Sequence, residues 1–234
     1  MRTLILASNN NHKFEEMRGI LAHLNAEITL LRPHDLGFTF DVEEHGTTFG
    51  ENAAAKAGGL YMLMKGILNR GVSASEQPEE IGDRLRKRFG DVLPAVIADD
   101  SGICVHALNN APGVYSARFG ADTPDPPTDD EGRNRYLLKV LADTDERGAH
   151  YVCNAVLVRD AEQYVQAEAT WHGSVLRRPI FGETGFGYDP LIYLEPYKTS
   201  VARIPQAQKN LISHRAKAVG AVVAAVGLAG HPFS

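Results

Sequence analysis

The segment Ile97–Ile103 restricts the possible folds more than any other part of the chain. The apolar run Ala95–Ala98 is typical of a buried strand, and Asp99, Asp100, a Ser-Gly pair and a second apolar run follow it. Two adjacent ionised carboxylates at the edge of a core repel each other and are costly to desolvate, so they need a cation, a hydrogen-bond donor or open water. We therefore expect the strand to end at this pair, and we expect Mg²⁺ to be the cation that binds it. The alternative is a simple turn, because Asp, Ser and Gly all favour turns.

The composition fits one large domain or two closely joined lobes. The chain has 234 residues, 44% of them hydrophobic, which is enough for a sizeable core. The formal net charge of −5 argues against a broad basic surface, so we expect no nucleic-acid partner. No apolar run has the length of a membrane span, and the N-terminus enters a strand pattern rather than a signal-peptide core, so we expect no membrane partner and a cytoplasmic location. Cys104 and Cys153 lie in apolar runs and receive no role.

A polar turn joins the first predicted strand to the first predicted helix. Residues 3–7 have a strand pattern, and apolar residues recur at helical spacing from 14 to 24. The turn between them presents backbone N–H groups and the positive end of a helix, which suits phosphate oxygens. Lys13 would lie in the first helical turn, where a cation is unfavourable by roughly 0.3–1 kcal/mol and a bound anion would relieve the cost. The alternative is a solvated lysine beside an asparagine N-cap.

Two capping-box patterns mark further helix starts. Thr48 and Glu51 have this spacing ahead of an alanine-rich helix, so a structural role for Glu51 competes with a metal-binding one. Asn52 and Lys56 share one face of that helix, where they could line a cleft or meet water. Thr128 and Glu131 form the second box. Two strand-like runs, 151–158 and 164–171, predict an antiparallel hairpin.

Two segments near the C-terminus combine glycine, aromatic rings and cations. Residues 182–190 interleave glycines with aromatic residues, a pattern that suits a planar heterocycle or, alternatively, a turn with core aromatics. Further on, Ser213 is a plausible N-cap, so His214 and Arg215 would project from a helix N-terminus, with Lys209 five residues before His214. Cations at the positive end of a helix favour an anion or a carbonyl as ligand.

Five ordered blocks carry a resemblance to a known family. The blocks are Ser8-x-Asn10-x-x-Lys13, Glu51-Asn52-Ala53, Ala98-Asp99-Asp100-Ser101-Gly102, Phe186-Gly187-Tyr188-Asp189-Pro190, and Lys209-Asn210 through Ser213-His214-Arg215. In this order and spacing, the chain resembles the inosine triphosphate pyrophosphatase family, also called Ham1 or RdgB-like. Each block alone is a weak signal, but together they span nearly the whole chain.

The resemblance implies an α/β fold with an elongated central mixed β-sheet, whose helices form two lobes around a nucleotide cleft. Residues 1–234 would then be a single ITPase-like domain and usually a homodimer, with a peripheral insertion at about 65–93 that is longer than the family's usual link. Residues 202–208 also lack the acidic residues that relatives often carry there. The family hydrolyses ITP, dITP and XTP to the nucleoside monophosphate and pyrophosphate with Mg²⁺, which removes damaged purines from the nucleotide pool.

The resemblance also implies roles for individual residues. Asp100 would be the general base and a ligand of Mg²⁺. Glu51 would be a further contact of the metal, and Asp99 would have a supporting role. Donors at His214 and Arg215 suit a 6-oxo purine, whereas the amino group of adenine would leave buried donors unpaired. The residues expected to bind the nucleoside triphosphate are Ser8, Asn9, Asn10, Asn11, His12, Lys13, Ser101, Phe186, Gly187, Tyr188, Asp189, Lys209, His214 and Arg215.

Two rival functions stay open at this point. An aspartyl-phosphate phosphatase or phosphotransferase also uses acidic residues with Mg²⁺, but it would release orthophosphate through a covalent intermediate. A nucleotide-binding module without catalysis would keep the cationic clusters and the aromatic segment and would have no use for Asp100. Product analysis separates the first rival from a pyrophosphohydrolase, and substitution of Asp100 separates the second.

Overall fold

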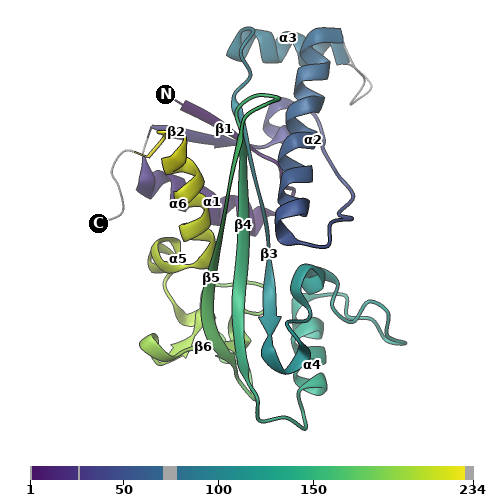
Figure 1. Ribbon diagram of the computed structural model, residues 1–234, viewed down its shortest axis with the longest axis vertical. Coiled ribbons are helices and arrows are strands. Elements are labelled where there is room, and N and C mark those ends of the chain that lie inside the picture. The colour runs from purple at the N-terminus through teal and green to yellow at the C-terminus, as the bar shows by residue number, and fades with distance from the viewer. Residues whose placement is uncertain (1, 26, 71–77, 230–234) are drawn as a thin grey trace. The chain divides into compact units, whose positions relative to one another are not determined.

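The computed structural model describes residues 2–25, 27–70 and 78–229, which have the predicted α/β fold with one mixed seven-stranded sheet (Figure 1). The strands are β1 (Arg2–Leu6), β2 (Ile28–Leu31), β3 (Ala95–Val105), β4 (Gly148–Val158), β5 (Tyr164–Val175), β6 (Ile192–Leu194) and β7 (Thr199–Ser200). The α-helices are α1 (Asn11–Leu24), α2 (Phe49–Arg70), α3 (Pro78–Phe89), α4 (Asp130–Val140), α5 (Gln206–Ile212) and α6 (His214–Ala225).

The sheet changes from parallel to antiparallel pairing across its width. The strand order is β2-β1-β3-β4-β5-β6-β7. β1 pairs in parallel with β2 and with β3, as expected where helical crossovers connect the strands, whereas β6 is antiparallel to β5 and to β7. β4 and β5 are neighbours in the sheet, and a hydrogen bond of 3.0 Å from Arg159 N to Gln163 O closes their connection. The predicted hairpin is therefore confirmed.

The chain divides into two compact units, each with its own apolar core. Unit 1 consists of residues 1–100, 154–168 and 217–234, and unit 2 consists of 101–153 and 169–216. In unit 1, α2 contributes the fully buried Ala53 and Ala57 to the core, and such small side chains allow a helix to pack closely. In unit 2, the core includes residues of α4, β4 and β5. The strands β3, β4 and β5 each contribute residues to both units.

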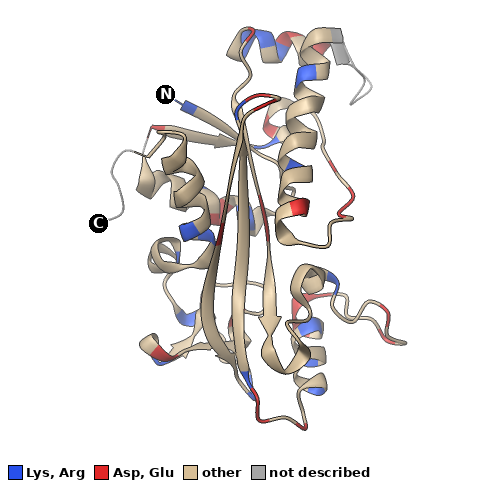
Figure 2. Ribbon diagram, viewed as in Figure 1, with Lys and Arg blue, Asp and Glu red and all other residues tan. Residues whose placement is uncertain are grey.

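The segment expected to be a peripheral insertion contains the end of α2 and the whole of α3. α3 is amphipathic, with buried Ile81 and Leu85 and a basic last turn, and Figure 2 shows its charged residues. Residues 71–77 of this segment lie outside the described residues. The single-domain organisation of 1–234 and the peripheral role of 65–93 stay predictions.

Strand β3 corrects the sequence analysis, because it does not end at the aspartate pair. It continues from Ala95 to Val105 through Asp99 and Asp100, and both aspartates are buried. Gly102 is not a turn residue either. A Cβ at Gly102 would lie 2.3 Å from Ser116 Oγ and 2.5 Å from Gly113 O, so glycine allows the 3-10 helix η3 (Gly113–Arg118) to approach the strand. Both carboxylates form ion pairs with lysines inside the protein, so they can be buried and the strand can continue past them.

The N-cap of α4 is a second correction. Thr128 does not cap this helix; Asp129 does, and its Oδ1 accepts a hydrogen bond of 2.7 Å from Gly132 N. A carboxylate at this position also interacts favourably with the positive end of the helix. The expected caps of the other helices are confirmed, because Asn10 caps α1 and Ser213 Oγ accepts from Ala216 N at 3.1 Å.

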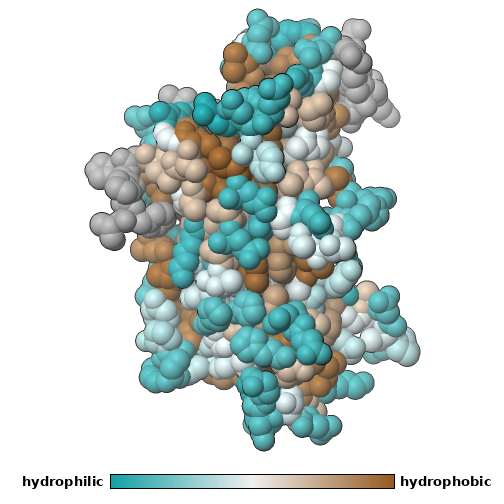
Figure 3. All heavy atoms as spheres, viewed as in Figure 1, coloured by the Kyte–Doolittle hydropathy of each residue, from teal (hydrophilic) through white to brown (hydrophobic). Residues whose placement is uncertain are grey.

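The surface is mixed in character. Figure 3 shows hydrophilic residues spread over the visible face, with smaller apolar areas between them. No helix in the described part of the chain is both long enough and apolar enough to cross a membrane. Cys104 and Cys153 are buried, as their apolar surroundings in the sequence predict.

We expect Gly102→Ala to destabilise the protein by about 1–3 kcal/mol, because the new methyl group would force η3 away from β3. The matched control is Gly58→Ala in α2, where a Cβ meets nothing within 4 Å. That change should leave stability unchanged or raise it by up to about 1 kcal/mol. The free energy of unfolding from chemical denaturation measures both effects. Equal stability of Gly102→Ala and the wild type would contradict the close packing.

Candidate active site

Asp99 is paired with a lysine from the first turn of α1. Lys13 Nζ lies 3.1 Å from Asp99 Oδ2, and the aspartate side chain is fully buried. The position of Lys13 near the positive end of a helix predicts a neighbouring anion, and Asp99 supplies one from within the protein. A phosphate that approached Lys13 would therefore have to share it with this carboxylate.

Asp100 is contacted by two side chains of α2. Asp100 Oδ1 accepts a hydrogen bond of 2.8 Å from Lys56 Nζ, and Oδ2 accepts one of 3.2 Å from Asn52 Nδ2. Lys56 Nζ also pairs with Glu44 Oε1 at 3.1 Å. Because Asn52 and Lys56 lie one helical turn apart, both reach the same carboxylate. Asn52 and Lys56 are both buried, so they do not simply meet water, and their place in a cleft stays a prediction.

The charge of Lys56 is maintained by its acidic neighbours. Burial acts to lower the pKa of Lys56, but the attraction and the hydrogen bond of Asp100, together with the charges of Asp99 and Glu44, outweigh it. The net result is a pKa above the ordinary value of a lysine. The ammonium group is therefore protonated at neutral pH, and the buried carboxylate of Asp100 has a permanent counter-charge.

Glu51 forms the predicted capping box. Its Oε2 accepts hydrogen bonds from Thr47 N at 2.7 Å and from Thr48 N at 3.1 Å, and Glu51 N donates in return to Thr48 Oγ1 at 3.2 Å. The hydrogen bonds from Thr47 and Thr48 lower the pKa of Glu51, so this exposed carboxylate is ionised at neutral pH. The structural role is thus established, and an exposed ionised carboxylate is also compatible with a metal-binding role.

The predicted phosphate-binding turn borders a pocket of about 340 Å³. Within the turn, Ser8 Oγ accepts from Asn10 N at 3.2 Å, Asn10 Oδ1 accepts from Lys13 N at 3.0 Å, and His12 is exposed in the first turn of α1. The sequence analysis missed Arg32, which follows β2, because a single arginine after a strand is not a specific signal. The residues lining the pocket are Asn9, Asn11, Arg32, His34, Phe38 and Thr39.

In unit 2, Asp189 lies at the centre of a buried polar network. Lys209 Nζ lies 2.7 Å from Asp189 Oδ2, which also accepts from Phe186 N at 3.0 Å. Tyr151 OH donates to Asp189 Oδ1 at 2.9 Å. Only 2% of Lys209 and 4% of Asp189 are exposed, so the ion pair is shielded from water and its geometry is fixed by the surrounding donors.

His214 belongs to an aromatic stack beside this network. Its ring lies almost parallel to that of Tyr151, with the ring centroids 4.8 Å apart at 7°, and the ring of Trp171 lies 6.2 Å away at 27°. The sequence analysis missed both Tyr151 and Trp171. Aromatic residues in strands are common packing residues, and nothing in the local sequence distinguishes these two.

Arg215 joins Ser101 and Phe186 into the same site. Arg215 Nη2 donates to Ser101 Oγ at 2.7 Å, and the guanidinium carbon lies 5.8 Å from the centroid of the Phe186 ring. Lys209 Nζ lies 5.0 Å from that centroid. Two buried cations beside one aromatic ring provide hydrogen-bond donors and a flat apolar surface together, which suits a planar heterocycle with a carbonyl group.

The middle of the glycine-rich segment is fixed by contacts inside unit 2. Gly187 N donates to Asp130 Oδ2 at 2.7 Å, and Gly187 O accepts from Asn134 Nδ2 at 3.0 Å. Tyr188 OH donates to Ser116 O at 2.8 Å, and burial raises the pKa of this phenol. These contacts give both residues structural roles, and their contact with a substrate stays a prediction.

Known proteins resemble this chain over almost its full length. The model of the Ham1 family matches residues 4–225. A dITP/XTP pyrophosphatase of Ralstonia nicotianae is 40% identical over 225 residues, covering 95% of this chain and 96% of the relative, and one of Clostridium perfringens is 38% identical over 221 residues, covering 94% of each.

Solved structures agree with this result. A HAM1 protein from Coxiella burnetii has a TM-score of 0.71 and 29% identity, and the match covers 98% of this chain and 100% of the Coxiella chain. The Ham1 protein of Staphylococcus aureus has a TM-score of 0.68 and 30% identity, with 97% and 98% covered.

We expect Lys56→Met to destabilise the protein by about 3–5 kcal/mol, because the buried carboxylate of Asp100 would lose its counter-charge. Lys65→Met, on the same helix, is the control and should change stability by no more than about 0.5 kcal/mol. Chemical denaturation at neutral pH measures the difference. If the two variants were equally stable, the contact between Lys56 and Asp100 would not support the fold.

Proposed function

The chain belongs to the Ham1 family, and we propose that it hydrolyses the non-standard purine nucleoside triphosphates ITP, dITP and XTP to nucleoside monophosphate and pyrophosphate. The relatives named dITP/XTP pyrophosphatase support this activity, which would remove damaged purines from the nucleotide pool. The observation that carries the proposal is the buried carboxylate of Asp100, contacted on one oxygen by Lys56 and on the other by Asn52.

The charges around Asp100 favour a substrate that arrives with a divalent cation. Lys13 pairs with Asp99, and Lys56 pairs with both Asp100 and Glu44. This cluster of two lysines and three carboxylates has one excess negative charge. A triphosphate adds about four more, and unit charges about 4 Å apart repel strongly outside bulk water. The lysines alone therefore cannot neutralise a bound triphosphate, and we propose Mg²⁺ as the cofactor.

The chemistry of the acidic residues fits Mg²⁺. This ion prefers oxygen ligands and usually takes one or two carboxylates, with phosphate oxygens and water in its other positions. Asp100 and the ionised Glu51 would provide those carboxylates. Among the residues that the structure describes, no group of three or more His, Cys, Asp or Glu side chains forms a metal site, which agrees with a site of one or two protein ligands. When bound, Mg²⁺ would neutralise phosphate charge and lower the pKa of nearby water.

Asp100 would act as the general base. Lys56 and Asn52 fix the plane of its carboxylate, so its remaining lone pairs have a defined direction in which to accept a proton from the attacking water. Lys13, at the positive end of α1, would hold a phosphate group together with the backbone of residues 8–12. In this proposal Asp99 positions Lys13 and takes no part in the proton transfer.

Unit 2 would recognise the purine. Arg215 and His214 would donate to the 6-oxo group, and Phe186 would contact the face of the base. Adenine has an amino group at that position, so it would leave buried donors unpaired, and sites of this kind can discriminate by roughly 10⁴-fold or more. The network of Lys209, Asp189 and Tyr151 would keep these groups in place.

The family resemblance also supports a homodimer, and a cytoplasmic location without a nucleic-acid or membrane partner belongs to the same proposal. The net charge of −5 is consistent with the absence of a broad nucleic-acid surface. These statements are part of the proposal, and the oligomeric state can be measured directly by light scattering of the purified protein.

Product analysis tests the reaction. Purified protein with Mg²⁺ is incubated separately with ITP, dITP, XTP, GTP and ATP, and both pyrophosphate and orthophosphate are assayed. We expect pyrophosphate and nucleoside monophosphate from the first three nucleotides, with much slower hydrolysis of ATP. Orthophosphate as the first product, with a phosphorylated protein, would favour an aspartyl-phosphate enzyme instead.

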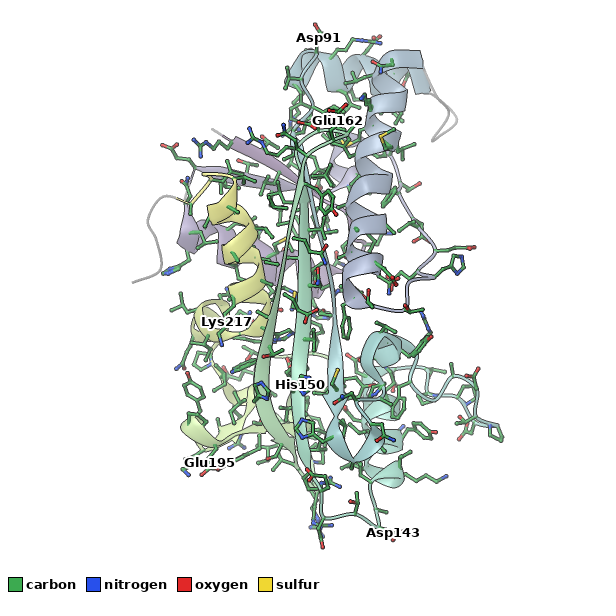
Figure 4. All side chains as sticks on the ribbon, in the orientation of Figure 1. Asp91, Asp143, His150, Glu162, Glu195 and Lys217 are labelled. Carbon is green, nitrogen blue, oxygen red and sulfur yellow. The ribbon has the colours of Figure 1, made fainter. Side chains whose placement is uncertain are left out.

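Substitution of the base tests the mechanism. We expect Asp100→Asn to reduce turnover of dITP by about 10²- to 10⁴-fold, the range that general base catalysis contributes, while the nucleotide Kd changes little. The matched control is Asp91→Asn, an exposed aspartate of the same unit that Figure 4 labels. Unchanged turnover of Asp100→Asn would remove Asp100 from the mechanism.

A further inference from the structure

Three histidines, two on neighbouring strands and one directly after a third strand, lie together in unit 2, outside the residues assigned to nucleotide hydrolysis. His106 begins the 3-10 helix η2 (His106–Leu108) directly after β3, His150 lies on β4 and His172 lies on β5. His106 Nε2 is 3.2 Å from His150 Nδ1, and the ring of His172 stacks on that of His150 with the centroids 5.2 Å apart. Figure 4 labels His150 on β4, and His106 and His172 are exposed.

The separation of the two nitrogens, 3.2 Å, is close to that in a metal chelate. Imidazole nitrogens bind Zn²⁺ at about 2.0–2.1 Å with tetrahedral geometry, which places two such nitrogens about 3.3–3.4 Å apart. We propose that His106 Nε2 and His150 Nδ1 together bind a divalent transition-metal ion of the class that prefers imidazole, with Zn²⁺ as its representative. The ion would replace the hydrogen bond between the rings and join the end of β3 to β4.

Gly148 creates the space that this arrangement needs. A Cβ at Gly148 would lie 2.5 Å from His106 Nδ1 and 2.8 Å from Glu146 Oε1, so only glycine allows the imidazole of His106 to lie there. Glu146 Oε1 is itself held in place, because it accepts a hydrogen bond of 2.8 Å from Gly148 N.

The proton balance of the chelate is simple. In the hydrogen bond between the rings, one of the two nitrogens carries a proton, and both must present lone pairs to a metal ion. If the donor is His106 Nε2, its proton moves to His106 Nδ1; if it is His150 Nδ1, its proton moves to His150 Nε2. Transfer of the proton within one ring leaves the charge of that imidazole unchanged, so no other reactant is needed.

The proposed site differs in chemistry from the carboxylate cluster of unit 1. Imidazole suits Zn²⁺, Cu²⁺ and Ni²⁺, whereas Mg²⁺ prefers carboxylate and water, so excess Mg²⁺ would not compete for the histidines. The described side chains include no group of three that forms a metal site, so water would complete the coordination. Because the ion would bind the folded protein, it would also raise the melting temperature.

The test is calorimetric titration of the full chain with ZnCl₂ at neutral pH and in excess MgCl₂. We expect one Zn²⁺ site, whose affinity falls by more than about tenfold in His106→Gln and in His150→Gln, because either change removes one of its two ligands. His172→Gln and His23→Gln are the controls and should keep the wild-type affinity. Equal Zn²⁺ affinity of the wild type and His106→Gln would overturn the proposal.

Two further measurements separate the chelate from a general effect of histidine loss. Gly148→Ala keeps both ligands but displaces the ring of His106, so it should also weaken Zn²⁺ binding. In the wild type, electron paramagnetic resonance of bound Cu²⁺ should show coupling to two imidazole nitrogens, and coupling to one or none would overturn the chelate. Magnesium-dependent hydrolysis of dITP, which the proposal does not involve, should be the same in all these variants and confirms that they are folded.

Discussion

Two consecutive carboxylates inside one strand require a cation on each side of that strand, and the organisation of unit 1 follows from this requirement. Neighbouring residues of a strand point to opposite faces, so one helix cannot serve both aspartates. Asp99 meets Lys13 of α1, and Asp100 meets Lys56 of α2. Burial of either carboxylate without its lysine would cost several kcal/mol, so these two contacts fix where both helices pack.

The same contacts set conditions on any anionic ligand. Each lysine of the cluster already has a carboxylate partner inside the protein, and Lys56 has two. A phosphate group can use Lys13 only in competition with Asp99, which makes the binding energy smaller than that of an unshared lysine. In our proposal the cluster therefore favours a ligand that brings its own positive charge, and a triphosphate with a divalent cation is such a ligand.

The sequence predicted correctly those features that depend on interactions between residues close together in the chain. The helix starts after Asn10, Thr48 and Ser213 follow from residues three positions apart, and the first strand follows from a short apolar run. The continuation of β3 through the aspartates depends instead on Lys56, which is 44 residues away in the sequence. A single sequence gives no sign of such a partner.

The same limit applies to the site of unit 2. Its predicted residues Ser101, Phe186 and Arg215 do come together. They could be predicted because the family motifs identify them directly, without any knowledge of the distances between them. Tyr151 contacts Asp189 across 38 residues, and its position in a strand with apolar neighbours suggests nothing beyond packing. The side chains that position a functional group are thus harder to predict than the group itself.

Asp100 and Asp189 are both buried aspartates paired with a lysine, and their hydrogen bonds explain why their proposed roles differ. Asp189 has three donors, with two on Oδ2, and that oxygen has no further lone pair in the carboxylate plane. Among the residues that the structure describes, Asp100 has one donor on each oxygen, so each oxygen retains one lone pair in that plane. A proton acceptor needs that capacity, whereas a residue that only fixes its neighbours does not. The number of donors therefore favours Asp100 as the base and Asp189 as a rigid support.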